Sequence, residues 1–479
     1  MKDFSEIAFG EISAEAEREI NPKLIEQGFV DLNSIEKEAL YGRRFLFLGY
    51  KGSGKSSVGE RLDLSQDGKH GRFVKKVSLA DFPFTPFSKI IKGDIEPEAK
   101  FPTAWSWILL IYVLESFGKD AGASHSDENE LLAALKLFEE LGVSPEASPA
   151  KIARTSSKNA FSFKIPLEIG KYSYESGPNK RPDDIFNFVA SLKNFIANTR
   201  SPNQHYLIID GLDDILSSRG VQYKSLYALM QEALELNSLF SKNSVPMKII
   251  VLCRTDLFDR TPGPNKNKIR SPYAFDLDWY HDPRTPDDSM LVRGANLRAT
   301  NSLNREVDIF SEFLPSHIHR TPTMQYFLDM TRHTPRDFFQ LLANMQKYHK
   351  SGKLTDSEVK SGLRDYSIKY FQPEIHDELS GYAEVDDIND FFSAISIVGK
   401  RDFSFEELTM AWTSERTESS IDILSSICKA VFYCSAIGNV THSGQQTHYS
   451  FKYRNRLSSF SKAKRIMLHR GLWKAMNVK

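Results

Sequence analysis

A glycine-rich segment at residues 49–56, with the sequence GYKGSGKS, restricts the fold of this chain more than any other feature. A short apolar run, Phe45 to Leu48, precedes the segment, and apolar residues at helical spacing follow it. The pattern G-x-x-x-x-G-K-[ST] between a buried strand and a helix is the Walker A motif, whose backbone surrounds phosphate groups. A glycine turn that matches by chance is the alternative, and the strand–loop–helix context argues against it. The segment therefore predicts the α/β fold of a P-loop NTPase, built on a parallel sheet.

The residue types of this loop each have a physical role in binding a phosphate. Its glycines let successive backbone N–H groups point at phosphate oxygens. Lys55 supplies a positive charge for the β- and γ-phosphates, and the Ser56 hydroxyl is suited to Mg²⁺. The helix that begins near Ser56 directs its positive end at the anion. We therefore expect ATP and Mg²⁺ as cofactors, bound by Gly49, Tyr50, Lys51, Gly52, Ser53, Gly54, Lys55, Ser56 and Ser57.

A second buried strand, Tyr206 to Ile209, ends in the acidic segment 210–214 with the sequence DGLDD. P-loop enzymes hold their metal with a carboxylate that usually follows a neighbouring strand. Asp210 is the predicted Mg²⁺ ligand, together with Ser56. Asp213 or Asp214 is expected to position the attacking water. A solvated turn or a helix cap is the alternative, and it stays open for the last two residues.

Two arginines are predicted to sense the γ-phosphate. Arg254 follows the apolar strand Lys248 to Leu252, and Arg336 follows Pro335 at the start of an amphipathic helix. A structural pair between Arg254 and Asp256 is the alternative for the first. A salt bridge at the helix start is the alternative for the second.

The length of 479 residues indicates more than one domain. Apolar strands alternate with helical stretches up to about residue 300, and residues 261–272 are expected to form a loop. Short strands are expected at 161–165 and 171–174. We predict a helical arm at 1–40, a P-loop NTPase core at 41–300 with a helical insertion at about 80–200, a helical lid at 301–380, and a winged-helix-like domain with a basic tail at 385–479.

The charge of the chain is divided unevenly along the sequence. The 62 basic and 62 acidic residues cancel, yet residues 423–479 contain ten basic residues and no acidic ones. The preceding residues therefore have a net charge of −10. Docking of the tail within the chain, self-assembly and a polyanion site all remain open. Any nucleic-acid contact is expected in 423–479.

The remaining composition is that of an ordinary folded protein, with 41% apolar and 26% charged residues. Three cysteines cannot form a disulfide framework, and the acidic N-terminus does not have the pattern of a signal peptide. The most apolar run, Trp105 to Leu114, has about half the length that spans a bilayer. We expect a cytoplasmic protein without membrane attachment.

The Walker A loop, the 210–214 segment and the Arg254-Thr255-Asp256 strand end resemble those of STAND and AAA+-related signalling ATPases. The likeness covers about residues 40–350 and is greatest to bacterial KAP-like and NACHT-like members, and among them to bacterial P-loop ATPases that often lie in phage-defence loci. It implies that Asp210 is the metal-binding acid of the Walker B motif, that Asp213 and Asp214 assist hydrolysis, and that Arg254 and Arg336 are sensors. The chain lacks the membrane helices of KAP proteins and the C-terminal repeats of most STAND proteins.

We therefore expect an ATP-hydrolysing switch that drives assembly, either as a homo-oligomer or through an effector-protein partner, in anti-phage defence. Two alternatives remain open. One is a DNA-binding regulator or DNA-dependent ATPase that acts through the C-terminal domain. The other is an ATP-binding scaffold with little turnover.

Overall fold

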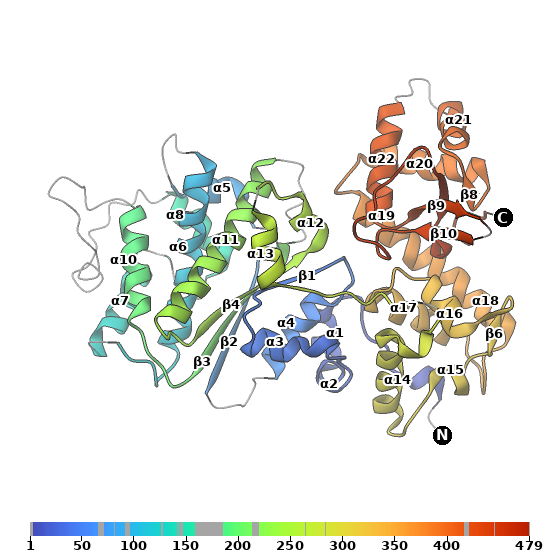
Figure 1. Ribbon diagram of the computed structural model, residues 1–479. Helices are drawn as coiled ribbons and strands as arrows, with labels where there is room; N and C mark the ends of the chain where they lie inside the picture. Colours follow the sequence, from blue (N-terminus) through green and yellow to red (C-terminus); the bar gives the residue numbers. More distant parts are fainter. Residues whose placement is uncertain are drawn as a thin grey trace. The chain divides into compact units, whose positions relative to one another are not determined.

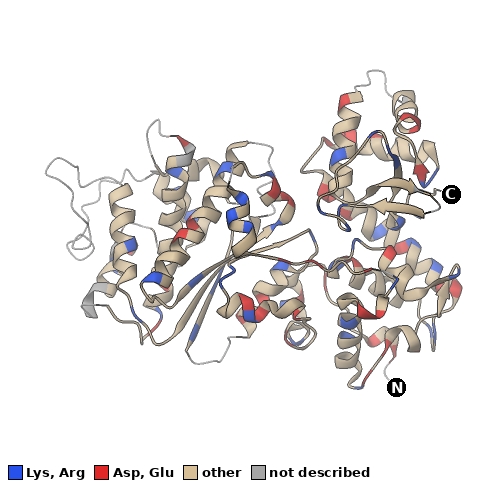
Figure 2. Cartoon of the chain, in the orientation of Figure 1, with Lys and Arg blue, Asp and Glu red and all other residues tan. Residues whose placement is uncertain are grey.

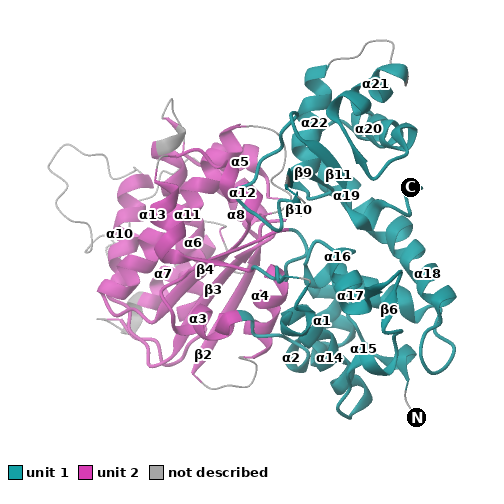
Figure 3. Cartoon of the chain, turned by 45° about the vertical axis from the view of Figure 1, so that its right-hand side comes forward, with its two compact units in different colours: residues 1–32, 51–54, 278–479 teal, residues 33–50, 55–277 magenta. Residues whose placement is uncertain are grey.

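The chain divides into two compact units, which Figure 3 shows in different colours. Unit 1 contains residues 1–32, 51–54 and 278–479, and unit 2 contains residues 33–50 and 55–277. The domain boundaries expected from the sequence are finer than this division and stay a prediction. The computed structural model describes residues 3–65, 71–80, 82–91, 96–125, 128–140, 143, 147–158, 185–212, 220–263, 265–282, 284–415, 421–444 and 446–478. Asp213, Asp214 and the strands predicted at 161–165 and 171–174 lie outside these residues.

Unit 2 is built on a parallel sheet of five strands in the order β2-β3-β4-β1-β5 (Figure 1). Apolar runs form the central strands and are buried, as is typical of a parallel sheet covered by helices. The predicted parallel α/β sheet is therefore confirmed. The strands are β1 (Leu46–Gly49), β2 (Arg72–Ser78), β3 (Gln204–Asp210), β4 (Met247–Arg254) and β5 (Ala274–Asp276).

The strand that ends in Asp210 was expected beside the phosphate-loop strand, but the two are not direct neighbours. Strand β4 lies between β1 and β3 and pairs with both. The helix α11 (Gly220–Lys242) connects β3 to β4, so the crossover places β4 beside β3 and leaves the other edge of β4 for β1. The carboxyl ends of β1 and β3 still lie at the same edge of the sheet.

Helices of the segment between the glycine-rich loop and the acidic segment 210–214 form much of the core of unit 2. The long helix α6 is buried along most of its length because it packs against α10 and α11. Its tryptophans find polar partners, since Trp105 Nε1 donates to the Ser225 carbonyl and Trp107 Nε1 donates to the Ser156 hydroxyl. No helix among the described residues is long and apolar enough to cross a membrane. The helices of this segment are α5 (Phe84–Ser88), α6 (Pro97–Gly118), α7 (Glu128–Glu140), α8 (Pro149–Lys158) and α10 (Ile185–Ala197).

The prediction of a loop at 261–272 is wrong for its second half, which belongs to the helix α13 (Lys266–Tyr273). Pro272 lies in the last turn of this helix and has no N–H to donate there, and the helix ends one residue later, at Tyr273. Ile269 is buried, and Arg270 pairs with Asp259 and Asp276. These contacts outweigh a local composition that favours a loop.

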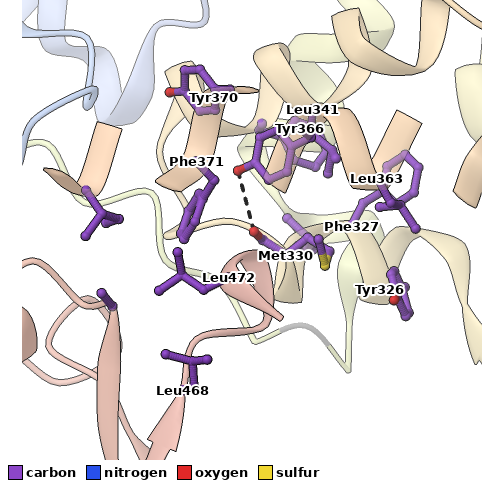
Figure 4. Packing of buried hydrophobic residues seen from close by; sticks show 14 of the residues in the cluster. Tyr326, Phe327, Met330, Leu341, Leu363, Tyr366, Tyr370, Phe371, Leu468 and Leu472 are labelled. Atoms are coloured by element: carbon purple, nitrogen blue, oxygen red, sulfur yellow. Dashed lines mark hydrogen bonds between the residues drawn. The ribbon is translucent and has the colours of Figure 1, made fainter. Parts of the chain in front are cut away.

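In unit 1, the N-terminal residues pack into the same apolar core as the helices after residue 290. Phe4, Ile7 and Phe9 are buried there, and the buried Arg298 pairs with Glu17. Figure 4 shows how this core continues from Phe371 of the lid region to Leu472 near the C-terminus. The helices are α1 (Ala14–Ile20), α2 (Pro22–Gln27), α14 (Met290–Leu303), α15 (Ile309–Glu312), α16 (Thr323–Asp329), α17 (Pro335–Gln346), α18 (Asp356–Asp365), a π-helix (Tyr366–Phe371) and α19 (Gln372–Leu379).

The C-terminal part of unit 1 has the winged-helix-like arrangement predicted from the sequence. Three helices are followed by a β-hairpin, and the strands form an antiparallel sheet in the order β10-β9-β11-β8. The elements are α20 (Val385–Val398), β8 (Asp402–Phe403), α21 (Phe405–Glu415), α22 (Ile421–Tyr433), β9 (Ile437–Ser443), β10 (Gln446–Ser450) and β11 (Arg465–Leu468).

The basic tail meets acidic residues of its own unit, and Figure 2 shows the two signs of charge interspersed there. Arg454 and Arg470 lie 3.0 and 3.3 Å from the carboxylate oxygens of Asp329. Arg465 pairs with Asp402, and Arg456 lies 3.6 Å from Asp278. Docking of the tail within the chain, one of the three explanations of the uneven charge left open above, is therefore present in this structure.

Candidate nucleotide-binding site

The glycine-rich segment has the strand–loop–helix geometry that the sequence predicts. Strand β1 ends at Gly49, and helix α4 (Lys55–Leu64) begins at Lys55, so that Ser56 and Ser57 lie in its first turn. Gly52 and Gly54 have φ values of +80° and +87°, in the left-handed region. A Cβ atom at Gly52 would also lie 3.1 Å from the Cβ of Arg336. Both the backbone and the space around it therefore require glycine at position 52.

The polar groups of the loop fit a phosphate ligand. Lys55 is only 6% exposed, and its Nζ atom donates to the Tyr50 carbonyl at 3.3 Å, across the loop. The Ser53 hydroxyl is buried and has no hydrogen-bond partner. Such an unpaired buried donor is costly unless a ligand or water satisfies it. Trp279 Nε1 donates to the Ser53 carbonyl at 2.9 Å and fixes the loop backbone.

Ser56 and Asp210, the two predicted metal ligands, lie together within unit 2. The Ser56 side chain lies close enough to the Asp210 carboxylate to lower its pKa, and the backbone N–H of Gly211 donates to Asp210 Oδ1 at 2.8 Å. Lys76 Nζ lies 3.9 Å from Asp210 Oδ2. Burial raises the pKa of Asp210, while Lys76, Gly211 and Ser56 oppose that rise. A hydroxyl and a carboxylate are ligands that suit Mg²⁺, so the site fits this cofactor.

Arg254 lies at the predicted place but with its guanidinium already paired. It ends β4, where its Cα is opposite that of Gly49 in the parallel register. Its Nε and Nη2 atoms donate to the two oxygens of Asp256 at 2.9 and 2.8 Å, and both side chains are buried. The structural pair named above as the alternative is therefore present. The role of Arg254 as a sensor remains a prediction.

Arg336 lies against the phosphate loop within unit 1. It follows Pro335 in the first turn of α17, where the Thr334 side chain caps the helix by accepting from the Asp337 N–H. Its backbone N–H donates to the Gly52 carbonyl at 3.3 Å, and its Nη1 atom donates to Glu374 Oε1 at 3.1 Å. Both the approach to the loop and the alternative salt bridge are therefore present.

Sequence reasoning missed Glu374, Lys76 and the contact of Trp279 with the loop. Each of them reaches the site from a segment without a recognised motif. A basic residue on β2, next to the strand that ends in Asp210, was the one available signal for Lys76. Asp213 and Asp214 lie outside the described residues, so their role in positioning water remains a prediction.

Next to Arg336, the turn before α17 is held by a buried ionic network. Arg332 binds both oxygens of Asp337 and, through Nη1, Glu378 Oε2 at 2.7 Å. Tyr370 donates to Asp337 as well, at 3.0 Å. Although burial opposes its charge, these carboxylates hold the pKa of Arg332 above its ordinary value, and Arg332 in turn lowers that of Asp337. The network fixes the start of α17 in unit 1.

Two buried histidines lie beside this network. His333 stacks on Tyr453, with ring centroids 5.3 Å apart, and His469 stacks on Phe371 at 4.9 Å. Burial lowers the pKa of both, that of His469 to about 3, with nearby arginines adding to the effect. Both imidazoles are therefore neutral in the folded chain.

Acid should therefore destabilise the protein through His469. In the unfolded chain, this side chain takes up a proton near its ordinary pKa of 6.5, whereas the folded chain resists protonation down to about 3. Its contribution to stability is complete above pH 6.5 and declines by about 1.4 kcal/mol per pH unit below it. At pH ~5 we expect a loss of about 2 kcal/mol from His469 alone, measured by urea unfolding.

The matched comparison is His469→Asn against His317→Asn. Asparagine keeps an acceptor for the Gly471 N–H, which His469 Nδ1 accepts at 3.1 Å, but it cannot be protonated. His469→Asn should make unfolding less sensitive to acid by that amount. His317 is exposed, so its replacement should leave the sensitivity unchanged. Equal acid sensitivity in the wild type and His469→Asn would contradict the prediction.

The fold and the loop together define the class of protein. The chain is an α/β protein with the parallel sheet of a P-loop NTPase, a helical lid and a C-terminal winged-helix-like domain. The family of FunZ-associated C-terminal helical domains matches residues 289–373, which correspond to the lid helices from α14 through the π-helix and the first residues of α19. A comparison with curated proteins found no match.

Solved structures similar to the chain include ORC and Cdc6p proteins. The ORC1 protein of Aeropyrum pernix in complex with DNA is 12% identical, with 93% of this chain and 89% of that chain covered and a TM-score of 0.34. Cdc6p from Pyrobaculum aerophilum is 13% identical, with 94% of each chain covered and a TM-score of 0.32. Drosophila ORC bound to DNA is 9% identical, with 97% and 98% covered and a TM-score of 0.30. With TM-scores this low, the fold class rests on the sheet and loop of this chain.

Proposed function

We propose that this chain is an ATP-binding and ATP-hydrolysing molecular switch that uses Mg²⁺. The observation that carries the proposal is the place of the Ser56 hydroxyl, at the start of α4 and one residue after Lys55, beside the Asp210 carboxylate whose pKa it lowers. Lys55 would neutralise the β- and γ-phosphates, while Ser56 and Asp210 would hold the metal. Asp213 or Asp214 would position the water, and Arg254 and Arg336 would respond to the γ-phosphate.

The scaffold with little turnover receives less support than the ATP-hydrolysing switch, because a hydroxyl and a carboxylate already placed together favour a metal-dependent reaction. The DNA-binding alternative also receives less support. Arg454, Arg465 and Arg470 of the tail are paired with Asp329 and Asp402 within unit 1. Each of these pairs would have to open before its arginine could bind a phosphate backbone.

The Asp210→Asn variant tests the proposed reaction. Asparagine keeps the shape and the acceptor for the Gly211 N–H, but it removes the negative charge that attracts Mg²⁺. We expect a loss of ATP turnover of roughly 100-fold or more, measured as released phosphate, whereas ATP binding without metal should persist. Because the Asp210 carboxylate is buried and its pKa is raised, the variant should unfold at a temperature no lower than the wild type.

A matched control is Asp259→Asn, which removes a partly exposed carboxylate of unit 2 that pairs with Arg270. This variant should hydrolyse ATP as the wild type does. Turnover that remains in Asp210→Asn at the wild-type rate would exclude Asp210 as the metal ligand. Turnover that is absent from the wild type itself would favour the scaffold.

The biological part of the proposal is that turnover controls assembly or an effector protein in bacterial anti-phage defence. It rests on the resemblance to STAND and KAP-like or NACHT-like ATPases described above. The Asp210→Asn protein serves here as well, since it should bind ATP without releasing it as product. ATP should therefore shift its solution mass persistently, and that of the wild type only transiently; an unchanged mass in both would count against assembly.

A further inference from the structure

The carboxylate of Glu374 holds two cations of the candidate site at once. Its Oε1 atom lies 3.2 Å from Nζ of Lys51 in the phosphate loop and accepts from Nη1 of Arg336 at 3.1 Å. All three residues belong to unit 1. Glu374 is 8% exposed, so water competes little with these two interactions. One side chain outside any motif therefore sets the positions of two cations beside the loop.

Glu374 is one of a pair of acids on the same face of α19. Glu378 follows it by four residues, which places both carboxylates one above the other. Glu378 binds Arg332, and Glu374 binds Arg336, so the two acids hold the two arginines on either side of the start of α17. Helix α19 is thereby tied to the loop-contacting end of α17 at two points.

The position of α19 in the chain connects these contacts to the C-terminal domain. The helix follows a π-helical segment, Tyr366–Phe371, and precedes α20 of the winged-helix-like domain. A π-helical turn within a helical run is frequently found at functional sites. His376 of α19 stacks on Phe392 of α20, with ring centroids 4.4 Å apart, so movement of α19 would reach the domain that follows it.

We propose that Glu374 is a positioning residue that competes with bound phosphate for Lys51 and Arg336. This inference rests on the proposed function, because the phosphates of ATP are the competitor. Two or three phosphate groups present more negative charge than one carboxylate, so Lys51 and Arg336 exchange Glu374 for the nucleotide. Helix α19 then loses one of its two ties to the α17 start, and the C-terminal domain attached to it senses the bound nucleotide.

The Glu374→Gln variant of the full chain tests this competition. Glutamine keeps the shape of the side chain but not its charge, so Lys51 and Arg336 become more available to an anion. We expect a fluorescent, non-hydrolysable ATP analogue to bind roughly 3- to 10-fold more tightly than to the wild type. Asp377→Asn is the matched control, since it removes an exposed acid of the same helix and should leave the affinity unchanged. Equal affinity of Glu374→Gln and Asp377→Asn would overturn the proposal.

A second measurement on the wild type does not depend on the folding of any variant. The ATP analogue should increase amide hydrogen exchange in α19, residues 372–379, because one tie of this helix is released. Unchanged or slower exchange in α19 would overturn the proposal while leaving nucleotide binding intact. If the wild type and Lys55→Ala both fail to bind the analogue, the proposed function itself is rejected, and the role of Glu374 with it.

Discussion

Replacing Lys55 with alanine should abolish nucleotide binding. Lys55 is 6% exposed, and its ammonium group reaches across the loop to the Tyr50 carbonyl, so it supplies positive charge where water is largely excluded. Loss of such a preorganised charge costs roughly 100-fold or more in binding and turnover. We expect Lys55→Ala to bind a fluorescent ATP analogue at least that much more weakly and to release no phosphate above background.

Stability measurements separate this effect from misfolding. The bond to Tyr50 is worth about 1 kcal/mol, so Lys55→Ala without nucleotide should unfold close to the wild-type midpoint. ATP at about 100 times its dissociation constant should stabilise the wild type by about 2.7 kcal/mol and the variant by nearly nothing. Lys242→Ala, at an exposed position of the same unit, should behave as the wild type. Equal stabilisation of Lys55→Ala by ATP would contradict the phosphate site.

Sequence reasoning was most successful where a local pattern determines the structure by itself. The strands β1, β3 and β4 are continuous apolar runs, and a buried parallel strand requires such a run. The encounter of Ser56 with Asp210 was also predictable, because the carboxyl ends of parallel strands meet at one edge of the sheet. The order of the strands was not, since the sequence does not show on which side of β4 the first strand will pair.

The parts of the site that were missed depend on contacts between distant segments. Glu374 has no motif of its own, and its two cations come from Lys51 and Arg336, at the loop and the lid. The helix α13 was missed because its composition is that of a loop, while the burial of Ile269 stabilises it only in the folded chain. In both cases tertiary packing decides what local propensity leaves open.

The charge asymmetry shows the same limit in a different way. The sequence reveals a basic tail and an acidic remainder, but not which charges meet. In the folded chain, one acid, Asp329, serves both Arg454 and Arg470, and burial raises its pKa while the two arginines oppose that rise. The positive charge of the tail thus helps to hold α16 and the C-terminal strands together within unit 1.

The second large effect is expected at Arg332, whose removal should destabilise unit 1 strongly. Arg332→Ala leaves the carboxylates of Asp337 and Glu378 buried without their cation. Breaking one side of a buried ion pair in this way costs about 3–5 kcal/mol. Arg305→Ala removes an exposed arginine paired with Glu312 in the same unit and should cost at most about 1 kcal/mol. Urea unfolding of the two variants measures the difference.

The pH dependence of this effect identifies its cause. Without Arg332, the pKa of Asp337 should rise, because the interaction that lowers it is gone while the burial that raises it remains. Acid then neutralises the buried Asp337 carboxylate, so the stability difference between Arg332→Ala and the wild type should shrink at pH ~5. A difference that is constant with pH would indicate lost packing against Phe371, over whose ring the guanidinium lies at 5.4 Å. Arg332 holds Asp337, whose N–H donates to the Thr334 cap at the start of α17, and this start carries Arg336 beside the phosphate loop. The Arg332→Ala variant should therefore bind ATP more weakly even where it remains folded.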